Sequence, residues 1–294
     1  QQPRSHQAVS DSRFSIPLLN MVLQLIYRFL PAPISTRSRD RLAILALAVG
    51  CQQAVMLPVS AQSPKLTAPT ALKTLLTKID AAANGRKLPE LLNYYSPNFT
   101  TSDGLNKTAW QQSLGQFWQT YSNLSYTTTL ESWQGSGNTY TTNTLTKIAG
   151  VQQLDGRTLN LQATIRSRQK IVGGQIVQQQ VLKERTQVSS GTKPPTIELS
   201  LPDQLQTNAE YNLDAIVTEP LGEDVLLGAT IEQPVSAQNY GQPANYKLEL
   251  LTAGGLFKIA NAPGKSGDYW FSTIFIRPAG MTTLTLRVRV VRDK

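Results

Sequence analysis

The sequence predicts two folded regions, an α+β region with three helices packed on an antiparallel sheet, followed by an all-β sandwich. The spacing of apolar residues changes from helical to alternating after Tyr121. A Pro-Pro linker follows at 189–195, and about seven short strand-like runs recur beyond it. Helices ahead of a long sheet are typical of α+β domains, and many short strands punctuated by Pro and Gly are typical of sandwiches.

Three helices are expected at the start of the first region. Apolar residues recur at helical spacing between Leu72 and Ile79, and Asn84-Gly85 then favours a helix end. A short helix is expected over 88–94, and a third helix over 107–121 carries its large apolar residues on one side. The segment 95–99, between these two helices, is predicted to form a turn.

Four long strands are predicted after the helices. Leu159, Leu161 and Ile165 alternate with polar residues, so one face of this strand is expected to be buried. Asp155-Gly156 and Gly173-Gly174 are turn signals between neighbouring strands. The predicted strands are 123–133, 138–149, 157–169 and 174–188.

The first region resembles the nuclear transport factor 2-like superfamily, including its SnoaL-like and ketosteroid-isomerase-like branches. The resemblance is carried by the first helix, by Leu88-Pro-Glu-Leu-Leu92 and Tyr95-Ser-Pro-Asn-Phe99, by the tryptophan-bearing third helix and by the four long strands. It implies a cone, formed by a curved sheet wrapped around a helix, with an apolar pocket and a tendency to dimerise through the outer sheet face. No catalytic residue of the enzymatic branches is matched here, and Asn98 stands where many relatives carry Asp.

The second region resembles an immunoglobulin-like β-sandwich. Gly267-Asp268-Tyr269, at the start of its sixth predicted strand, resembles a tyrosine corner, although the usual cysteine pair is absent. The expected domain limits are a leader at 1–61, a linker at 62–70, the α+β domain at 71–189, a linker at 190–195 and the sandwich at 196–294.

The leader is expected to contain a secretory signal. Residues 37–61 combine a basic start, an apolar run and a small-residue cleavage site before Gln62. Two alternatives stay open, a lipoprotein anchored to the membrane through Cys51 and an uncleaved anchor. Each of these places the rest of the chain in the periplasm, a lumen or the extracellular space.

Cleavage at this site would remove the two most reactive side chains, because His6 and Cys51 are the only histidine and cysteine. Ser-His and Cys-His nucleophiles, His/Cys zinc sites and disulfides would then be excluded. No metal and no cofactor are expected. Residues 62–294 hold 22 Lys+Arg and 17 Asp+Glu, a net charge of +5. Without a basic stripe carrying interleaved aromatics, nucleic acid is not an expected partner.

The predicted site residues are aromatic side chains of the first region, which either line an apolar ligand pocket or fill the core. They are Tyr95, Trp110, Trp118, Tyr126 and Tyr140. The acids most available for general base work are Asp103, Glu131 and Glu184. Their alternative roles are surface solvation or pairing with Arg166 or Lys183. The basic pairs Arg166/Arg168 and Arg287/Arg289 are expected on solvated sheet faces.

These observations favour an exported, non-catalytic binding or interaction protein. Its partners would be a small apolar ligand in the cone, a second copy of the chain or another protein, and it would meet a membrane only if lipidated at Cys51. Two alternatives stay open, a small-molecule isomerase or dehydratase built on the cone and an envelope-associated assembly factor.

Overall fold

The computed structural model describes residues 67–241, 244–251 and 254–292. The predicted leader, with His6 and Cys51, lies outside the described residues. No helix in the described part of the chain is long and apolar enough to cross a membrane.

Three helices are described, and each lies where the apolar spacing predicts it. They are α2 (Thr70–Asn84), α3 (Leu88–Leu92) and α4 (Lys107–Thr120). α2 buries Leu72, Leu75 and Leu76 on one side. α4 begins after Asn106, whose side chain accepts a hydrogen bond from the Ala109 backbone N–H at 2.9 Å and so caps the helix.

The segment 95–99 forms a strand, so the prediction of a turn is wrong. β1 (Tyr95–Thr101) pairs in parallel with β5 (Gln175–Gly191), with a register shift between Tyr95 and Thr100. Pro97 has no backbone N–H to donate, and the shift accommodates it at a strand edge. Tyr95 and Phe99 are 5% and 1% exposed, so the apolar side chains of this segment belong to the core.

The four long strands of the first region lie close to the predicted ranges. β2 (Ser122–Ser136), β3 (Thr139–Leu154), β4 (Arg157–Val172) and β5 pair as successive antiparallel neighbours. The second region contributes β6 (Ile197–Ser200), β7 (Gln204–Gln206), β8 (Glu210–Val217), β9 (Leu226–Pro234), β10 (Glu249–Leu251), β11 (Gly255–Asn261), β12 (Gly267–Arg277) and β13 (Gly280–Val291).

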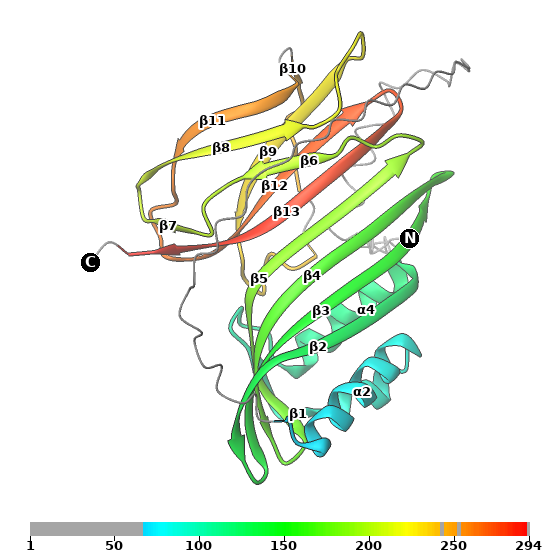
Figure 1. The fold of residues 1–294 in the computed structure, drawn as a ribbon, viewed down its shortest axis with the longest axis vertical. Coiled ribbons are helices and arrows are strands. Elements are labelled where there is room, and N and C mark those ends of the chain that lie inside the picture. The colour runs from blue at the N-terminus through cyan, green and yellow to red at the C-terminus, as the bar shows by residue number, and fades with distance from the viewer. Residues whose placement is uncertain (1–66, 242–243, 252–253, 293–294) are drawn as a thin grey trace, which may run out of the picture.

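A large sheet runs through both regions. The described strands form a ten-stranded sheet, with the order β10-β9-β12-β13-β5-β4-β3-β2 and with β1 and β7 added at its side, and a three-stranded sheet β11-β8-β6. One edge of β5 pairs first with β1 and then with β13, from Arg185↔Leu286 to Gly191↔Gly280. Figure 1 shows β2–β5 continuing into β13 and β12 as one twisted sheet.

The predicted fold class, an α+β cone with three helices plus a separate immunoglobulin-like sandwich, is therefore wrong. Alternation shows which residues form a strand, but it does not show which distant strand will pair with it. The tyrosine-corner hydrogen bond does form, from the Tyr269 hydroxyl to the Lys265 carbonyl at 2.9 Å. The strand that contains Tyr269, β12, however, belongs to the sheet that continues into the first region.

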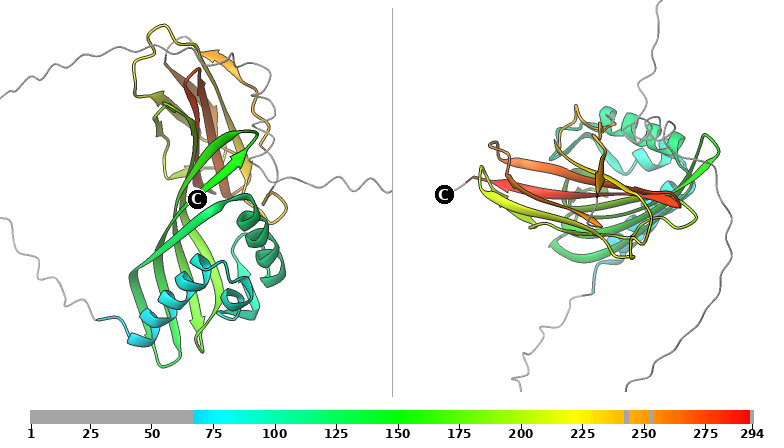
Figure 2. Two further views of the ribbon diagram at one scale, coloured as in Figure 1. Left: turned by 90° about the vertical axis from the view of Figure 1, so that its right-hand side faces the viewer. Right: turned by 90° about the horizontal axis from the view of Figure 1, so that it is seen from above.

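The two faces of the large sheet are covered differently. Opposed residues of antiparallel strands share a face, so Thr186, Thr285 and Ser272 lie together on one side. Helices α2 and α4 lie against the sheet in the first region, as Figure 2 shows. The three-stranded sheet packs on β12 and β13 through a cluster that includes Leu213 and Phe271. Because Phe271 directly precedes Ser272 on β12, it faces the opposite side, so the three-stranded sheet does not cover the side that carries Ser272 and Thr186.

Candidate ligand-binding cavity

A cavity of about 460 Å³ lies on the side of the large sheet that carries Thr186 and Ser272, next to helices α2 and α4. Its walls come from α2 and α4, from one face of β2–β5, from β12 and β13, and from the connection between β9 and β10, which contributes Tyr240, Gly241, Ala244 and Tyr246. The cavity therefore spans both regions, although the sequence predicted a pocket in the first region alone. Its volume lies in the range of sites for small organic molecules.

Four of the five predicted aromatic residues lie on the wall of this cavity, namely Tyr95, Trp110, Trp118 and Tyr126. The fifth, Tyr140, is not among the lining residues. It packs instead against Trp133 across the β2–β3 pair, with the ring centroids 6.2 Å apart. That these four residues bind a ligand remains a prediction.

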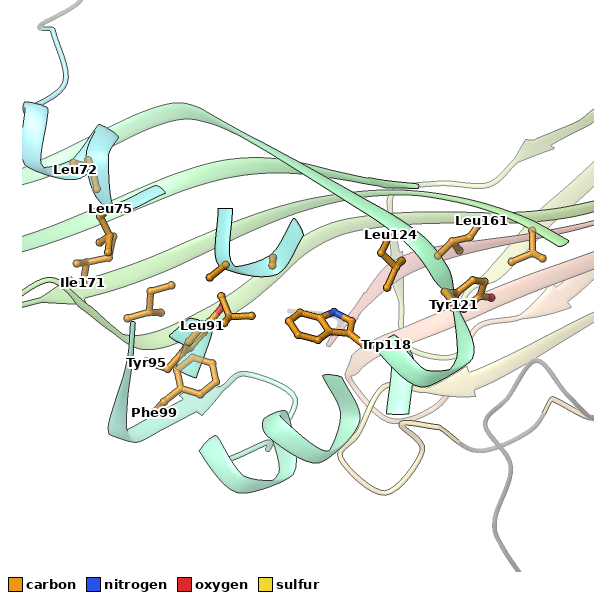
Figure 3. Packing of buried hydrophobic residues seen from close by; sticks show 14 of the residues in the cluster. Leu72, Leu75, Leu91, Tyr95, Phe99, Trp118, Tyr121, Leu124, Leu161 and Ile171 are labelled. Atoms are coloured by element: carbon orange, nitrogen blue, oxygen red, sulfur yellow. The ribbon is translucent and has the colours of Figure 1, made fainter. Parts of the chain in front are cut away.

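A hydrogen bond holds Trp118 and Tyr126 together on the cavity wall. Trp118 lies between a group around Tyr95 and Leu91 and a second group around Tyr121 and Leu161 (Figure 3). Its indole N–H donates a hydrogen bond to the Tyr126 hydroxyl at 2.8 Å. Burial raises the pKa of Tyr126, and that of Tyr95, to about 12. Both hydroxyls are therefore neutral at physiological pH and serve as hydrogen-bonding groups rather than bases.

The second region contributes cavity residues that sequence reasoning missed, among them Tyr240, Tyr246 and Trp270. Tyr240 and Trp270 form an edge-to-face pair with centroids 5.2 Å apart. No local signal identifies these residues, because they reach the cavity only through the pairing of β13 with β5.

Glu184, one of the three predicted acids, lies on β5 and lines the cavity. Its carboxylate accepts a hydrogen bond from the Trp270 indole N–H at 3.1 Å, and it forms no ion pair with any described residue. Burial raises the pKa of the Glu184 carboxyl, and the Trp270 hydrogen bond, the charge of Arg287 and a hydrogen bond from Thr186 oppose this only in part. A carboxyl of this kind can hold a proton or attract a cation.

Asp103 has a different environment, in the loop between β1 and α4. Its carboxylate accepts hydrogen bonds from Arg287 on β13, at 2.5 and 3.0 Å, and from the Tyr240 hydroxyl at 2.6 Å. Burial alone would raise the pKa of Asp103, but the hydrogen bonds and charge of Arg287 hold it below its ordinary value. Asp103 therefore ties the first region to the second as a buried anion.

The prediction that Arg287 lies on a solvated face is wrong. Arg287 is 6% exposed and also bonds Asp268 at 2.6 Å, and Asp268 in turn bonds Arg289 at 2.8 Å. Alternation placed Arg287 and Arg289 on one face, but it gave no sign that Asp103 covers part of that face.

The third predicted acid, Glu131, has the alternative role expected for it, which is pairing with Arg166. It pairs with Arg166 at 2.7 Å on the exposed face of the sheet. Lys183 pairs with Asp203 at 2.8 Å rather than with any of the three predicted acids.

One further carboxylate lines the cavity, that of Asp80 on α2. It accepts hydrogen bonds from the Thr128 backbone N–H at 2.7 Å and from the Thr128 hydroxyl at 2.6 Å. Within the described part of the chain, no group of three or more His, Cys, Asp and Glu side chains is arranged to hold a metal ion.

Residues 192–291 match a family described as "Domain of unknown function (DUF8623)". None of the curated proteins matches the chain. The family match begins within the predicted linker at 190–195. The predicted domain limits themselves remain predictions.

Several solved structures are similar to part of the chain. The protein Bd1075 of Bdellovibrio bacteriovorus is 13% identical with a TM-score of 0.28, over 37% of this chain and 39% of its own. A candidate SnoaL-like polyketide cyclase from Shewanella putrefaciens is 11% identical with a TM-score of 0.31, over 39% of this chain and 90% of its own. An LEH-like epoxide hydrolase of M. tuberculosis is 8% identical with a TM-score of 0.28, over 38% of this chain and 81% of its own.

The chain spans little more than a third of the length of Bd1075. The similar structures include members of the SnoaL-like and ketosteroid-isomerase-like branches that the first region resembles, whereas the immunoglobulin-like resemblance is not confirmed. With TM-scores this low, the similarities support no inference about chemistry.

Proposed function

We propose that this protein binds a small, flat, largely apolar molecule in the cavity between the helices and the large sheet. The observation that carries the proposal is the cavity of about 460 Å³, whose wall includes Trp110, Trp118, Trp270 and several tyrosines. Aromatic walls favour flat apolar ligands, and a few hydrogen-bonding groups would fix the orientation of the ligand.

The test is a calorimetric titration with naphthylethanol, a neutral probe small enough for the cavity. Thr186 lines the cavity from β5, so Thr186→Phe places a ring in the space that the probe would occupy. Thr164→Phe is the matched control, because it adds the same ring to the opposite face of β4, where Thr164 is paired with Arg185. We expect the wild type and the control to bind one equivalent and Thr186→Phe to bind none. Equal binding by all three would place the probe elsewhere and contradict the proposal.

A second candidate function, proton transfer to or from the bound molecule, is favoured by the environment of Glu184. Burial raises the pKa of this carboxyl, and a raised pKa suits a carboxyl that acts as a general acid or base near neutral pH. The test begins with molecules extracted from protein purified from its source. A change in their structure on incubation with the wild type, and not with Glu184→Gln, would favour catalysis, whereas unchanged recovery would favour binding alone.

We also propose that the protein acts outside the cytoplasm, after cleavage before Gln62. The apolar run and small residues of 37–61 support this. N-terminal sequencing of the processed protein should begin at Gln62. A mature chain that retains Cys51 would contradict cleavage before Gln62, and a Cys51 that is retained without acylation would also leave the location unsupported.

A further inference from the structure

The described part of the cavity wall carries acidic side chains and no basic ones. Among the described residues that line it there are two acids, Asp80 and Glu184, and no Lys, Arg or His. The chain as a whole has the opposite balance, with 28 Lys+Arg against 19 Asp+Glu. A protein that is basic overall thus has no basic side chain among the described residues of its cavity wall.

The charged groups nearest Glu184 satisfy one another without it. Arg287 bonds Asp103 and Asp268, and Arg289 bonds Asp268, so two arginines balance two aspartates. Glu184 then adds one negative charge that no described residue neutralises by an ion pair. Arg287 acts on Glu184 only as a more distant charge, and Asp103 acts with the opposite sign. A buried carboxylate is costly unless a proton or a cation accompanies it.

The two cavity acids are not equally available to a ligand. Asp80 is bonded by both the backbone N–H and the hydroxyl of Thr128. Glu184 accepts a hydrogen bond from the Trp270 indole N–H at 3.1 Å, and the Thr186 hydroxyl is a second, weaker partner. Three further atoms of the cavity wall are buried without a hydrogen-bond partner among the described residues, the Gln169 side-chain oxygen, the Thr283 hydroxyl and the Trp110 indole N–H. The wall thus offers a ligand both acceptors and a donor, and the case for a cation rests on the Glu184 carboxylate.

We infer that the ligand is an apolar cation, a flat hydrocarbon group that bears an ammonium, and that its nitrogen pairs with Glu184. This inference rests on the proposed function, because it assigns a ligand class to the same cavity. The aromatic rings around Glu184, including Trp270 and Tyr240, would also attract the ammonium through their electron-rich faces. A hydrogen-bonded ion pair away from bulk water is stronger than its neutral counterpart.

The experiment compares naphthylethylamine, which is protonated at neutral pH, with the neutral naphthylethanol, by calorimetric titration of the full chain. We expect the wild type to bind the ammonium about tenfold or more tightly than the alcohol, the gain of one charge-assisted hydrogen bond. Glu184→Gln should remove this preference and still bind the alcohol. Glu131→Gln, the same change at an exposed pair, should keep the preference.

A pH series on the wild type tests the inference without a variant. As the pH falls and Glu184 gains its proton, affinity for the ammonium should fall, while affinity for the alcohol should stay constant. Asp103, Arg287 and Tyr240 also surround Glu184. The pKa of Asp103 is lowered and the pKa values of Arg287 and Tyr240 are raised, so Asp103 and Arg287 stay charged and Tyr240 stays neutral while Glu184 gains its proton.

Three results would overturn the inference. Equal affinity for the two probes would reject the cation, and a preference that survives in Glu184→Gln would reject its pairing with Glu184. Either result would leave the proposed function standing. Failure of both probes to bind would reject the cation together with the proposed function.

Discussion

The junction between the two regions and the cavity beside it are both buried, and both contain carboxylates, but they balance charge differently. At the junction, Asp103 bonds Arg287 at 2.5 Å, and the network closes with Asp268 and Arg289. In the cavity, Glu184 has an indole N–H and no ion pair among the described residues. The junction is satisfied within the protein, whereas the cavity is not.

The pKa directions follow from this difference. Both Asp103 and Glu184 lose hydration, which raises the pKa of a carboxyl. At Asp103 the hydrogen bonds and charge of Arg287 reverse that effect. At Glu184 the hydrogen bond from Trp270 and the more distant charge of Arg287 do not reverse it. A fully paired acid stabilises the fold, whereas an acid without a cation is retained at a cost and is a candidate for function.

The largest effect is expected from separating the two regions. The fragment 196–294 should still unfold cooperatively, because its apolar clusters are formed by its own residues, including Leu213, Phe271 and Ile274. It loses β5 and Asp103, so we expect it to be less stable than the full chain by more than about 3–5 kcal/mol, the cost of removing one partner of a buried pair. Thermal unfolding followed by circular dichroism measures this. An unchanged midpoint would show that the shared sheet contributes little.

A smaller loss is expected from Arg287→Met, which leaves Asp103 buried without its cation. We expect a loss of about 3–5 kcal/mol in the free energy of unfolding. Arg166→Met, at the exposed pair with Glu131, should cost about 1 kcal/mol or less. Denaturant titration of both variants compares the two sites. Equal losses would contradict the distinction between a buried junction and a solvated face.

The smallest effect is expected at Glu184, and it has the opposite sign. Because the folded-state pKa of Glu184 is raised, its contribution to stability falls as the pH rises above the ordinary value of 4.5. Glu184→Gln should therefore raise the unfolding midpoint at neutral pH, with the gain vanishing below that value. The pair of Asp103 with Arg287 has the opposite pH dependence. The pKa of Asp103 is lowered, so the stability that this pair contributes is lost as the pH falls. A destabilised Glu184→Gln at neutral pH would count against an unbalanced carboxylate.

The sequence predicted local structure well and long-range pairing not at all. Alternation over 157–169 located β4 (Arg157–Val172), and helical spacing from Leu72 located α2. Four of the predicted aromatic residues line one cavity, on elements that pack locally, and their role in binding stays a prediction. The contact of Asp103 with Arg287 joins residues 184 positions apart, and that of Glu184 with Trp270 joins residues 86 positions apart. Such contacts depend on the pairing of β13 with β5, which period-2 alternation does not encode.

The most direct test of the whole account is a crystal structure of the full chain grown with naphthylethylamine. The account predicts the naphthyl ring among the aromatic residues of the cavity, with the ammonium nitrogen about 3 Å from a Glu184 carboxylate oxygen. A cavity closed by its own side chains, or a probe bound only on the outer surface, would contradict it.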